Sequence, residues 1–291
     1  MPVSRRSYST DLTDAEWQIL EPLLPAEKPG GRHRLYGLRE IINALRYLLR
    51  TGCSWRLLPH DFPHWRTVYE YFKVWKEDGT WLKMHDYFHA ELRERMGRDK
   101  QPSAAIVDSQ SVKTTEKGGA RGYDGGKKVA GRKRHIAVDT TGLLIRAVVH
   151  SAAVRDADGA ELIFAAVKEI NHRIKKIWAD MGYRGERLRQ WIAANTAWEL
   201  EIVQKPRRWG WYPEGVEPAP MPAFTVLKRR WVVERTFAWL GRYRRLSKDY
   251  EYLPKSSETM IYLAMSGLML RRLAIKAPYG VASPQRLKLK R

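Results

Sequence analysis

Cysteine and long apolar runs are scarce in this chain of 291 residues. Its single cysteine, Cys53, excludes a disulfide framework and a zinc site built from several cysteines. The longest apolar run, Met260 to Leu270, is too short to cross a bilayer, and the opening MPVSRRSYSTD lacks the apolar segment of a secretory signal. We therefore expect a cytoplasmic protein without a membrane partner.

Acidic residues are also in short supply. The chain holds 53 Lys and Arg against 32 Asp and Glu, a net charge of +21 that is spread along its whole length. The hydrophobic fraction of 44% argues against global disorder, and the length allows one large or two modest domains. This charge predicts nucleic acid as the partner, although a merely basic or ribosome-associated protein would share it.

The first hundred residues have the apolar spacing of helices. One helix, over about residues 65–76, should bury an apolar stripe and expose a basic and aromatic face. The stripe is Val68, Phe72 and Trp75, and the exposed face is Arg66, Tyr69 and Lys73. This pattern is compatible with a helix-turn-helix that reads the major groove, and equally with an ordinary small helical bundle.

Two histidines in this region, His85 and His89, stand four residues apart with Asp86 after the first. The spacing is close to the H-E-x-x-H zinc motif, but the acid is Asp and no third ligand is evident nearby. We interpret the segment as an amphipathic helix with two incidental histidines.

From about residue 103 the pattern changes to alternating strands and helices. We expect strands over 104–108, 135–139, 143–150, 174–180 and 200–204, and helices over 158–171, 184–194 and 256–273. A strand followed by a hairpin, and then by alternating helices and strands, predicts an α/β fold with a ribonuclease H-like mixed sheet. An all-α domain would precede it.

Three carboxylates stand out in this second region. Asp108 and Asp180 end apolar, strand-like runs, and their strands can be neighbours in the predicted sheet. Glu234 is the only acid between Leu227 and Lys248, in a segment basic enough to lie against phosphate. A lone carboxylate there would weaken that contact unless it holds a metal ion. Three carboxylates on divalent metal beside nucleic acid would make a site that cuts and joins phosphodiesters.

A glycine-rich, basic stretch at residues 113–134 resembles a nucleotide-binding P-loop only loosely, because its Gly-Lys-Ser/Thr ending is replaced by GRK. We interpret it as a flexible loop that follows the DNA backbone. Its candidate contacts are Lys127, Lys128, Arg132, Lys133 and Arg134.

Several other residues, and one segment, allow two interpretations each. Trp231 can stack on an unpaired base or pack in the core, and the many tryptophans of the chain favour the core. The Pro- and Trp-rich segment 205–225 is either a functional loop or a surface excursion. We expect turn or N-cap roles for Asp139, Asp156 and Asp158, and a structural or phosphate-contacting role for His135.

Seven sequence blocks resemble the DDE-type transposases of bacterial insertion sequences. They are LTDAEWQILEPLLP, GCSWRLLPHDFPHW, IVDSQSVK, GRKRHIAVDTTGLL, VVHSA, ADMGYRG and RWVVERTFAWLGRYRRLSKDYE, and the resemblance covers nearly the whole chain. It implies that Asp108, Asp180 and Glu234 are a catalytic triad that holds Mg²⁺, which Mn²⁺ can replace.

The resemblance also implies an activity and a layout. A homodimer on DNA, at the nucleoid, would cleave the terminal inverted repeats of the element and transfer the 3′-hydroxyl into target DNA. Residues 1–100 would form a helical domain that binds the DNA ends, 101–275 the catalytic domain, and 276–291 a basic, disordered tail.

The chain departs from the family signature around the third acid, which has a Tyr, an Arg, the Glu and then a Lys. Arg230 occupies the Arg position, but the Tyr and Lys positions hold Leu227 and Gly241. Arg242 and Arg245 are candidates to replace the missing Lys, Arg245 because we expect it on the same helix face as the acid.

Two alternatives share these features. A nuclease on the same fold would cut without strand transfer, and a DNA-binding protein could carry a catalytically silent domain. The metal site is common to the transposase and the nuclease, so the residues alone do not separate them.

Overall fold

The computed structural model describes residues 5–27, 30, 33–116, 119–203 and 230–275. The segment 205–225, Leu227 and the tail 276–291 lie outside them. The chain forms two compact units, which are described separately. The sheet unit comprises Leu49–Gly52 and Pro102–Tyr262, and the helical unit is drawn from Met1–Leu48, Cys53–Gln101 and Leu263–Arg291.

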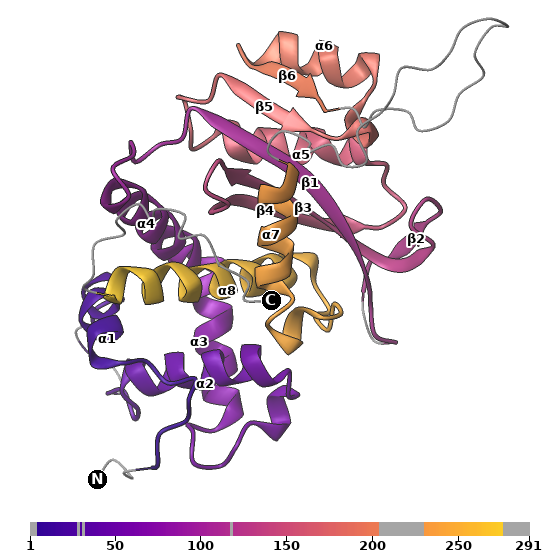
Figure 1. The fold of residues 1–291 in the computed structure, drawn as a ribbon. Helices are drawn as coiled ribbons and strands as arrows, with labels where there is room; N and C mark the ends of the chain where they lie inside the picture. Colours follow the sequence, from indigo (N-terminus) through magenta and orange to yellow (C-terminus); the bar gives the residue numbers. More distant parts are fainter. Residues whose placement is uncertain (1–4, 28–29, 31–32, 117–118, 204–229, 276–291) are drawn as a thin grey trace, which may run out of the picture. The chain divides into compact units, whose positions relative to one another are not determined.

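The sheet unit is built on six strands of mixed direction (Figure 1). They are β1 (Ala104–Lys113), β2 (Gly122–Asp124), β3 (Val129–Asp139), β4 (Leu144–Ser151), β5 (Lys176–Ala179) and β6 (Glu199–Ile202). Strand β1 pairs antiparallel with β3 and parallel with β5, β5 pairs parallel with β6, and β4 and β2 pair with β3. This arrangement confirms the predicted ribonuclease H-like fold.

The glycine-rich stretch is more ordered than predicted. Strand β1 continues five residues past Asp108, and β3 begins at Val129, so much of the expected loop is paired strand. Gly131 permits the close pairing, because a Cβ there would lie 1.9 Å from the carbonyl oxygen of Val112. The prediction of a long flexible loop was wrong at its end, where the basic residues belong to β3.

Helices cover both faces of the sheet. On one face, α5 (Asp156–Lys168) and α6 (Glu186–Asn195) share a buried apolar cluster with the odd-numbered residues Ala105 and Val107 of β1. Successive strand residues point to opposite faces, so Ile106 and Asp108 face the other side. There α7 (Arg230–Leu240) packs against β1 and β3.

Helix α7 is shorter than the basic segment suggested. It ends at Leu240, and a 3-10 turn, η4 (Arg244–Leu246), follows before α8 (Pro254–Ala274) begins. Arg245 therefore does not share a helix face with Glu234, which corrects that prediction.

The helical unit confirms the predicted periodicity. Its main elements are α1 (Asp14–Leu20), η1 (Glu21–Leu23), α2 (Leu38–Thr51), η2 (Trp55–Leu57), α3 (Trp65–Glu77) and α4 (Thr80–Arg95). Helix α3 buries Val68, Phe72 and Trp75, as expected. His85 and His89 are buried in α4, and no group of three or more potential metal ligands occurs in the part of the chain that the structure describes.

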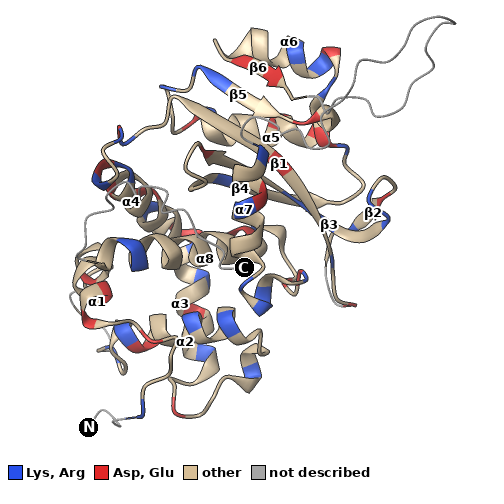
Figure 2. Ribbon diagram, viewed as in Figure 1, with Lys and Arg blue, Asp and Glu red and all other residues tan. Residues whose placement is uncertain are grey.

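Basic residues occur on helices and strands throughout the chain rather than on one segment (Figure 2). No helix among the described residues is both long and apolar enough to span a bilayer.

Candidate active site

Asp108 and Asp180 lie beside each other on neighbouring parallel strands. Ile106 of β1 pairs with Trp178 of β5, and each aspartate stands two residues further along its strand direction. Asp180 comes directly after β5 and caps the 3-10 turn η3 (Met181–Tyr183), where its Oδ1 accepts a hydrogen bond of 2.8 Å from the Gly182 amide. The sheet itself therefore brings these two predicted acids together.

The pKa of Asp108 is raised from 3.8 to about 6, mainly by burial and further by the charge of Asp180. A hydrogen bond of 2.7 Å from the Ser109 amide and the charge of Arg230 act in the opposite direction. A buried carboxylate that is destabilised by a second one favours an added cation between them.

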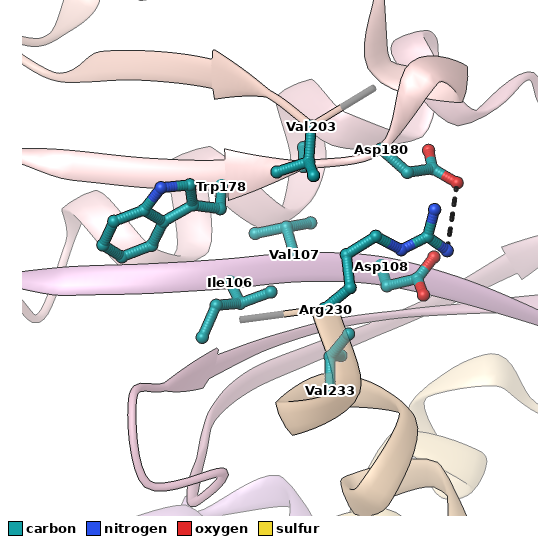
Figure 3. A pocket seen from close by; sticks show the side chains of 9 residues that line it. Ile106, Val107, Asp108, Trp178, Asp180, Val203, Arg230 and Val233 are labelled. Atoms are coloured by element: carbon teal, nitrogen blue, oxygen red, sulfur yellow. Dashed lines mark ion pairs between the residues drawn. The ribbon is translucent and has the colours of Figure 1, made fainter. Parts of the chain in front are cut away.

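Helix α7 supplies a cation and the third acid at the same end of the sheet. The Arg230 Nη2 atom lies 3.8 Å from Asp180 Oδ2 and 3.8 Å from Glu234 Oε1. Figure 3 shows the Arg230 guanidinium beside the carboxylates of Asp180 and Asp108. The Glu234 side chain is 60% exposed, so it is open to an incoming ligand.

A small pocket lies against these groups, lined by apolar side chains and by the charged residues themselves (Figure 3). Its lining is Ile106, Val107, Asp108, Trp178, Ala179, Asp180, Val203, Arg230 and Val233. The apolar walls account for the burial that raises the pKa of Asp108.

The donor set fits Mg²⁺ or Mn²⁺, because carboxylate oxygens are the ligands these hard cations prefer. Asp108 and Asp180 already converge, and the guanidinium of Arg230 stands in for a cation between Asp180 and Glu234. Among the described residues, no group of three or more His, Cys, Asp or Glu side chains is gathered closely enough to hold an ion.

The predicted DNA contacts divide by burial. Those on the surface are Arg66 and Lys73 on α3, Lys127 and Lys128 between β2 and β3, and Trp231 and Arg242, with Arg230 half-buried. Those buried are Arg132, Lys133, Arg134 and Arg245. The structure does not place the four buried residues where they can touch DNA.

The buried arginines serve the fold instead. Arg132 donates to the Glu251 carbonyl at 2.7 Å, and Arg134 donates to the Leu246 carbonyl at 2.7 Å. Arg245 pairs with the Glu251 carboxylate at 2.8 Å, so it is not the replacement for the missing signature Lys. The irregular segment between α7 and α8 has backbone carbonyls that no helix or strand pairs. A guanidinium with five N–H groups can donate to several of them at once.

Trp231 does not pack in the core, which corrects the favoured prediction. It is 52% exposed, and the Arg235 guanidinium lies 4.6 Å from its ring centroid. Arg235 also lies over Trp239 and donates to the Thr141 carbonyl at 2.6 Å. Sequence reasoning missed Arg235, although its spacing of four residues from each tryptophan was a usable signal.

The remaining acids and His135 have structural partners. Asp139 accepts from the amides of Thr141 and Leu143 in the hairpin turn, as predicted. His135 is buried, and its Nδ1 lies 3.0 Å from the Tyr183 hydroxyl, which confirms a structural role. The N-cap of α5 is Arg155, and Asp156 and Asp158 lie inside the first turn of this helix, so the turn or N-cap role predicted for both was wrong.

Comparison with known proteins gives matches over most of the chain. Residues 99–269 match the family described as transposase DDE domain, and residues 12–85 match a putative transposase of the IS4/5 family. An uncharacterized 16.2 kDa protein of insertion element IS402 from Burkholderia cepacia is 30% identical over 113 residues, which is 37% of this chain and 76% of that protein. The putative transposase for insertion sequence element IS402 from the same organism is 29% identical over 133 residues, 42% of this chain and 54% of that protein.

Proposed function

Because this chain belongs to the DDE transposase family, we propose that it cleaves DNA at the ends of its insertion sequence and joins the freed end to target DNA. The observation that carries the proposal is the placement of Asp108 and Asp180, each two residues beyond the paired Ile106 and Trp178 of neighbouring parallel strands. Arg230 and Glu234 of α7 lie at the same end of the sheet.

In this proposal Asp108, Asp180 and Glu234 hold the divalent metal. When bound, Mg²⁺ lowers the pKa of the attacking hydroxyl and neutralises charge on the leaving oxygen. The three carboxylates must be ionised for this task, and burial raises the pKa of Asp108, so this residue loses its proton less readily than an ordinary aspartate.

The reaction consists of two displacements at phosphorus. In the first, a water oxygen bonds to the scissile phosphorus and the bond to the 3′ oxygen breaks, which leaves a 3′-hydroxyl and a 5′-phosphate and returns a proton to solvent. In the second, the 3′-hydroxyl oxygen bonds to a target phosphorus and the target's own bond to its 3′ oxygen breaks. The number of phosphodiesters is unchanged in this second step.

Arg230 and Trp231 are the proposed substrate contacts beside the acids. The planar fork of a guanidinium suits two phosphate oxygens as well as two carboxylates, so Arg230 can turn from Asp180 and Glu234 to the DNA backbone. The exposed Trp231 ring, held from one side by Arg235, offers a surface on which an unpaired base can stack.

End recognition is proposed for the helical region, residues 1–100, and catalysis for residues 101–275. Arg66 and Lys73 are exposed on α3, opposite the buried stripe of that helix, where a groove-reading helix would carry them. At least a dimer is proposed on DNA, because two element ends must be held together during transfer.

The test is incubation of the purified protein with a labelled DNA end and a plasmid target, in Mg²⁺ or in EDTA. The DNA end is taken from the inverted repeats that flank the gene. Mg²⁺-dependent joining to the plasmid is the expected result. Nicking without joining would favour a nuclease, and binding with neither would favour a DNA-binding role.

The triad is tested separately with Asp108→Ala. This variant should bind the DNA end as the wild type does but should not cleave it, because a metal ligand is lost. Full cleavage by the variant would refute the assignment of Asp108.

A further inference from the structure

The turn between β2 and β3 is held rigidly by Asp124. Its Oδ1 accepts from the amides of Gly126 at 3.1 Å and Lys127 at 3.0 Å, and its Oδ2 accepts from the Ser111 hydroxyl at 2.6 Å. Burial alone would raise the pKa of Asp124, but these hydrogen bonds and the charge of Lys133 lower it to about 2. The carboxylate stays ionised at neutral pH, so the turn that presents Lys127 is anchored.

Lys127 is exposed as a residue, yet its ammonium group is tied to the strand that carries Asp108. The Nζ atom donates to the carbonyl oxygen and to the hydroxyl of Ser109, each at 2.9 Å. An ammonium has three N–H groups, so one N–H remains beyond the two that bind Ser109. The cation is thereby fixed next to the residue that follows Asp108.

The half-buried carboxylate of Asp156 orients the Ser109 hydroxyl for this contact. Ser109 donates its hydroxyl hydrogen to Asp156 Oδ1 at 2.8 Å, so the hydroxyl lone pairs face Lys127. The same Asp156 oxygen is 2.9 Å from Lys133 Nζ. Burial would raise the pKa of Asp156, but Lys133, Lys127 and Ser109 lower it.

Asp156 also lies close to the second candidate acid. A Cβ placed on Gly182 would be 3.0 Å from Asp156 Oδ2 and 3.1 Å from Asp180 Oδ1. The chain of contacts from Lys127 through Ser109 to Asp156 therefore ends near Gly182, whose amide donates to Asp180 Oδ1. Arg230 and Lys127 are the cations that lower the pKa of Asp108.

The Lys position of the family signature is Gly241, which has no side chain. Of the two candidates to replace that Lys, Arg245 is bound to Glu251, and Arg242 is exposed and stays a candidate. We propose that Lys127 is a further catalytic residue, whose ammonium group contacts a non-bridging oxygen of the phosphate that is cleaved. This inference rests on the proposed function.

Charge develops on the phosphate oxygens as the new P–O bond forms and the old one breaks. A preorganised donor at that place stabilises the transition state more than the bound substrate. Lys127 forms no covalent bond and transfers no proton in this role. Ser109 and Asp156 act as positioning residues, since they hold the ammonium group without touching the substrate.

The test compares Lys127→Gln, Lys127→Arg and Lys168→Gln. Lys168 is an exposed lysine at the C-terminal end of α5 and has no part in the site, so it is the matched control. The measurements are the single-turnover cleavage rate at saturating DNA and Mg²⁺, and the Kd for the DNA end over a salt series. Thermal unfolding checks that each variant is folded.

Lys127→Gln should slow cleavage about 100-fold or more, as removal of a transition-state donor does, with the Kd for the DNA end changed less than about threefold. Lys127→Arg should recover most of the rate, and Lys168→Gln should match the wild type. Asp156→Asn keeps the ammonium group of Lys127 but weakens the hydrogen bond that orients Ser109. The cleavage rate of this variant should fall by about tenfold.

Two results would overturn the assignment while the wild type still cleaves. One is an unchanged rate in Lys127→Gln. The other is a weaker Kd with a shallower salt dependence but a normal rate at saturation, which marks an ordinary backbone contact. If the wild type itself shows no Mg²⁺-dependent cleavage, the proposed function fails and this role fails with it.

Discussion

Burial makes the ionised form of Asp108 costly to the fold. Its pKa in the folded protein is about 6 against 3.8 for the ordinary group, so the folded state holds the proton more tightly than the unfolded chain. The stability that this proton contributes is complete below pH 4 and is lost as the pH rises through 6. A difference of this size corresponds to about 3 kcal/mol at most.

Asp108→Asn should therefore stabilise the metal-free protein at pH 8, because a neutral group of the same shape removes the cost. The gain should be about 1–3 kcal/mol at pH 8 and should vanish near pH 4, where the wild-type carboxyl is also neutral. Urea unfolding in EDTA at the two pH values measures it. A destabilised variant at pH 8 would contradict the burial argument.

In the proposed metal site, Arg230 would compete with the metal for Asp180 and Glu234, with which it forms ion pairs of 3.8 Å. Arg230→Gln should bind Mn²⁺ more tightly, about three- to tenfold, because Asp180 and Glu234 lose a cationic neighbour. Its cleavage rate should nevertheless fall, since a phosphate contact is lost. Electron paramagnetic resonance of Mn²⁺ with the free protein gives the affinity, and Arg155→Gln, on an exposed pair with Asp158, is the control.

The affinity should also depend on pH. Below pH 6, Mn²⁺ binding by the wild type should weaken about tenfold per unit, because Asp108 must lose its proton to act as a ligand. An affinity that is independent of pH between 5 and 6 would show that Asp108 does not hold the ion.

At the scale of elements, consecutive basic side chains of β3 point alternately to the two faces of the sheet. Arg132 and Arg134 bind carbonyls of the segment between α7 and α8, whereas Lys133 and His135 bind Asp156 and Tyr183 in the α5 layer. Strand β3 thus binds the helical layers on both faces of the sheet. Burial lowers the pKa of Arg134 to about 10, which still leaves it charged at neutral pH.

Arg134→Met should cost about 1–3 kcal/mol of unfolding free energy, because the carbonyls of Leu246 and Lys248 lose their donors. Arg121→Met, at an exposed position, should change stability by less than about 0.5 kcal/mol. Urea denaturation compares the two. If Arg134→Met lost DNA binding and kept its stability, the structural role given to β3 would be wrong.

For the whole molecule, we expect the net charge of +21 to make the proposed DNA binding depend on salt, while specificity for the ends would need particular side chains. We expect Arg66→Ala with Lys73→Ala to weaken binding to the element end about tenfold or more relative to unrelated DNA. The cleavage rate at saturating DNA should change little. Competition binding measures the ratio, with Lys83→Ala on α4 as the control.

A small helical bundle that does not read DNA would behave differently. The double variant would then lose no more specificity than Lys83→Ala, and end recognition would have to lie elsewhere in the chain.

The spacing of apolar residues and the ends of apolar runs were enough to predict many elements of this protein from the sequence alone. Two short apolar runs predicted β5 and the first half of β1, with Asp108 and Asp180 at their ends, and the helical stripe of α3 was predicted residue by residue. Both depend on neighbours within one element, where the repeat of the backbone sets which side chains share a face. The order of the elements then predicted a ribonuclease H-like mixed sheet, which the observed strand pairing confirms.

The tertiary structure alone decided which basic residues are buried and which meet solvent. Arg132, Arg134 and Arg245 read as DNA contacts, but their partners are carbonyls and a carboxylate that no local pattern specifies. The exposure of Trp231 likewise depends on how α7 packs against the sheet. The link from Lys127 to Ser109 and on to Asp156 joins residues 18 and 47 positions apart. Such contacts form only in the folded protein, because the turn, the strand and the helix are brought together by the tertiary structure.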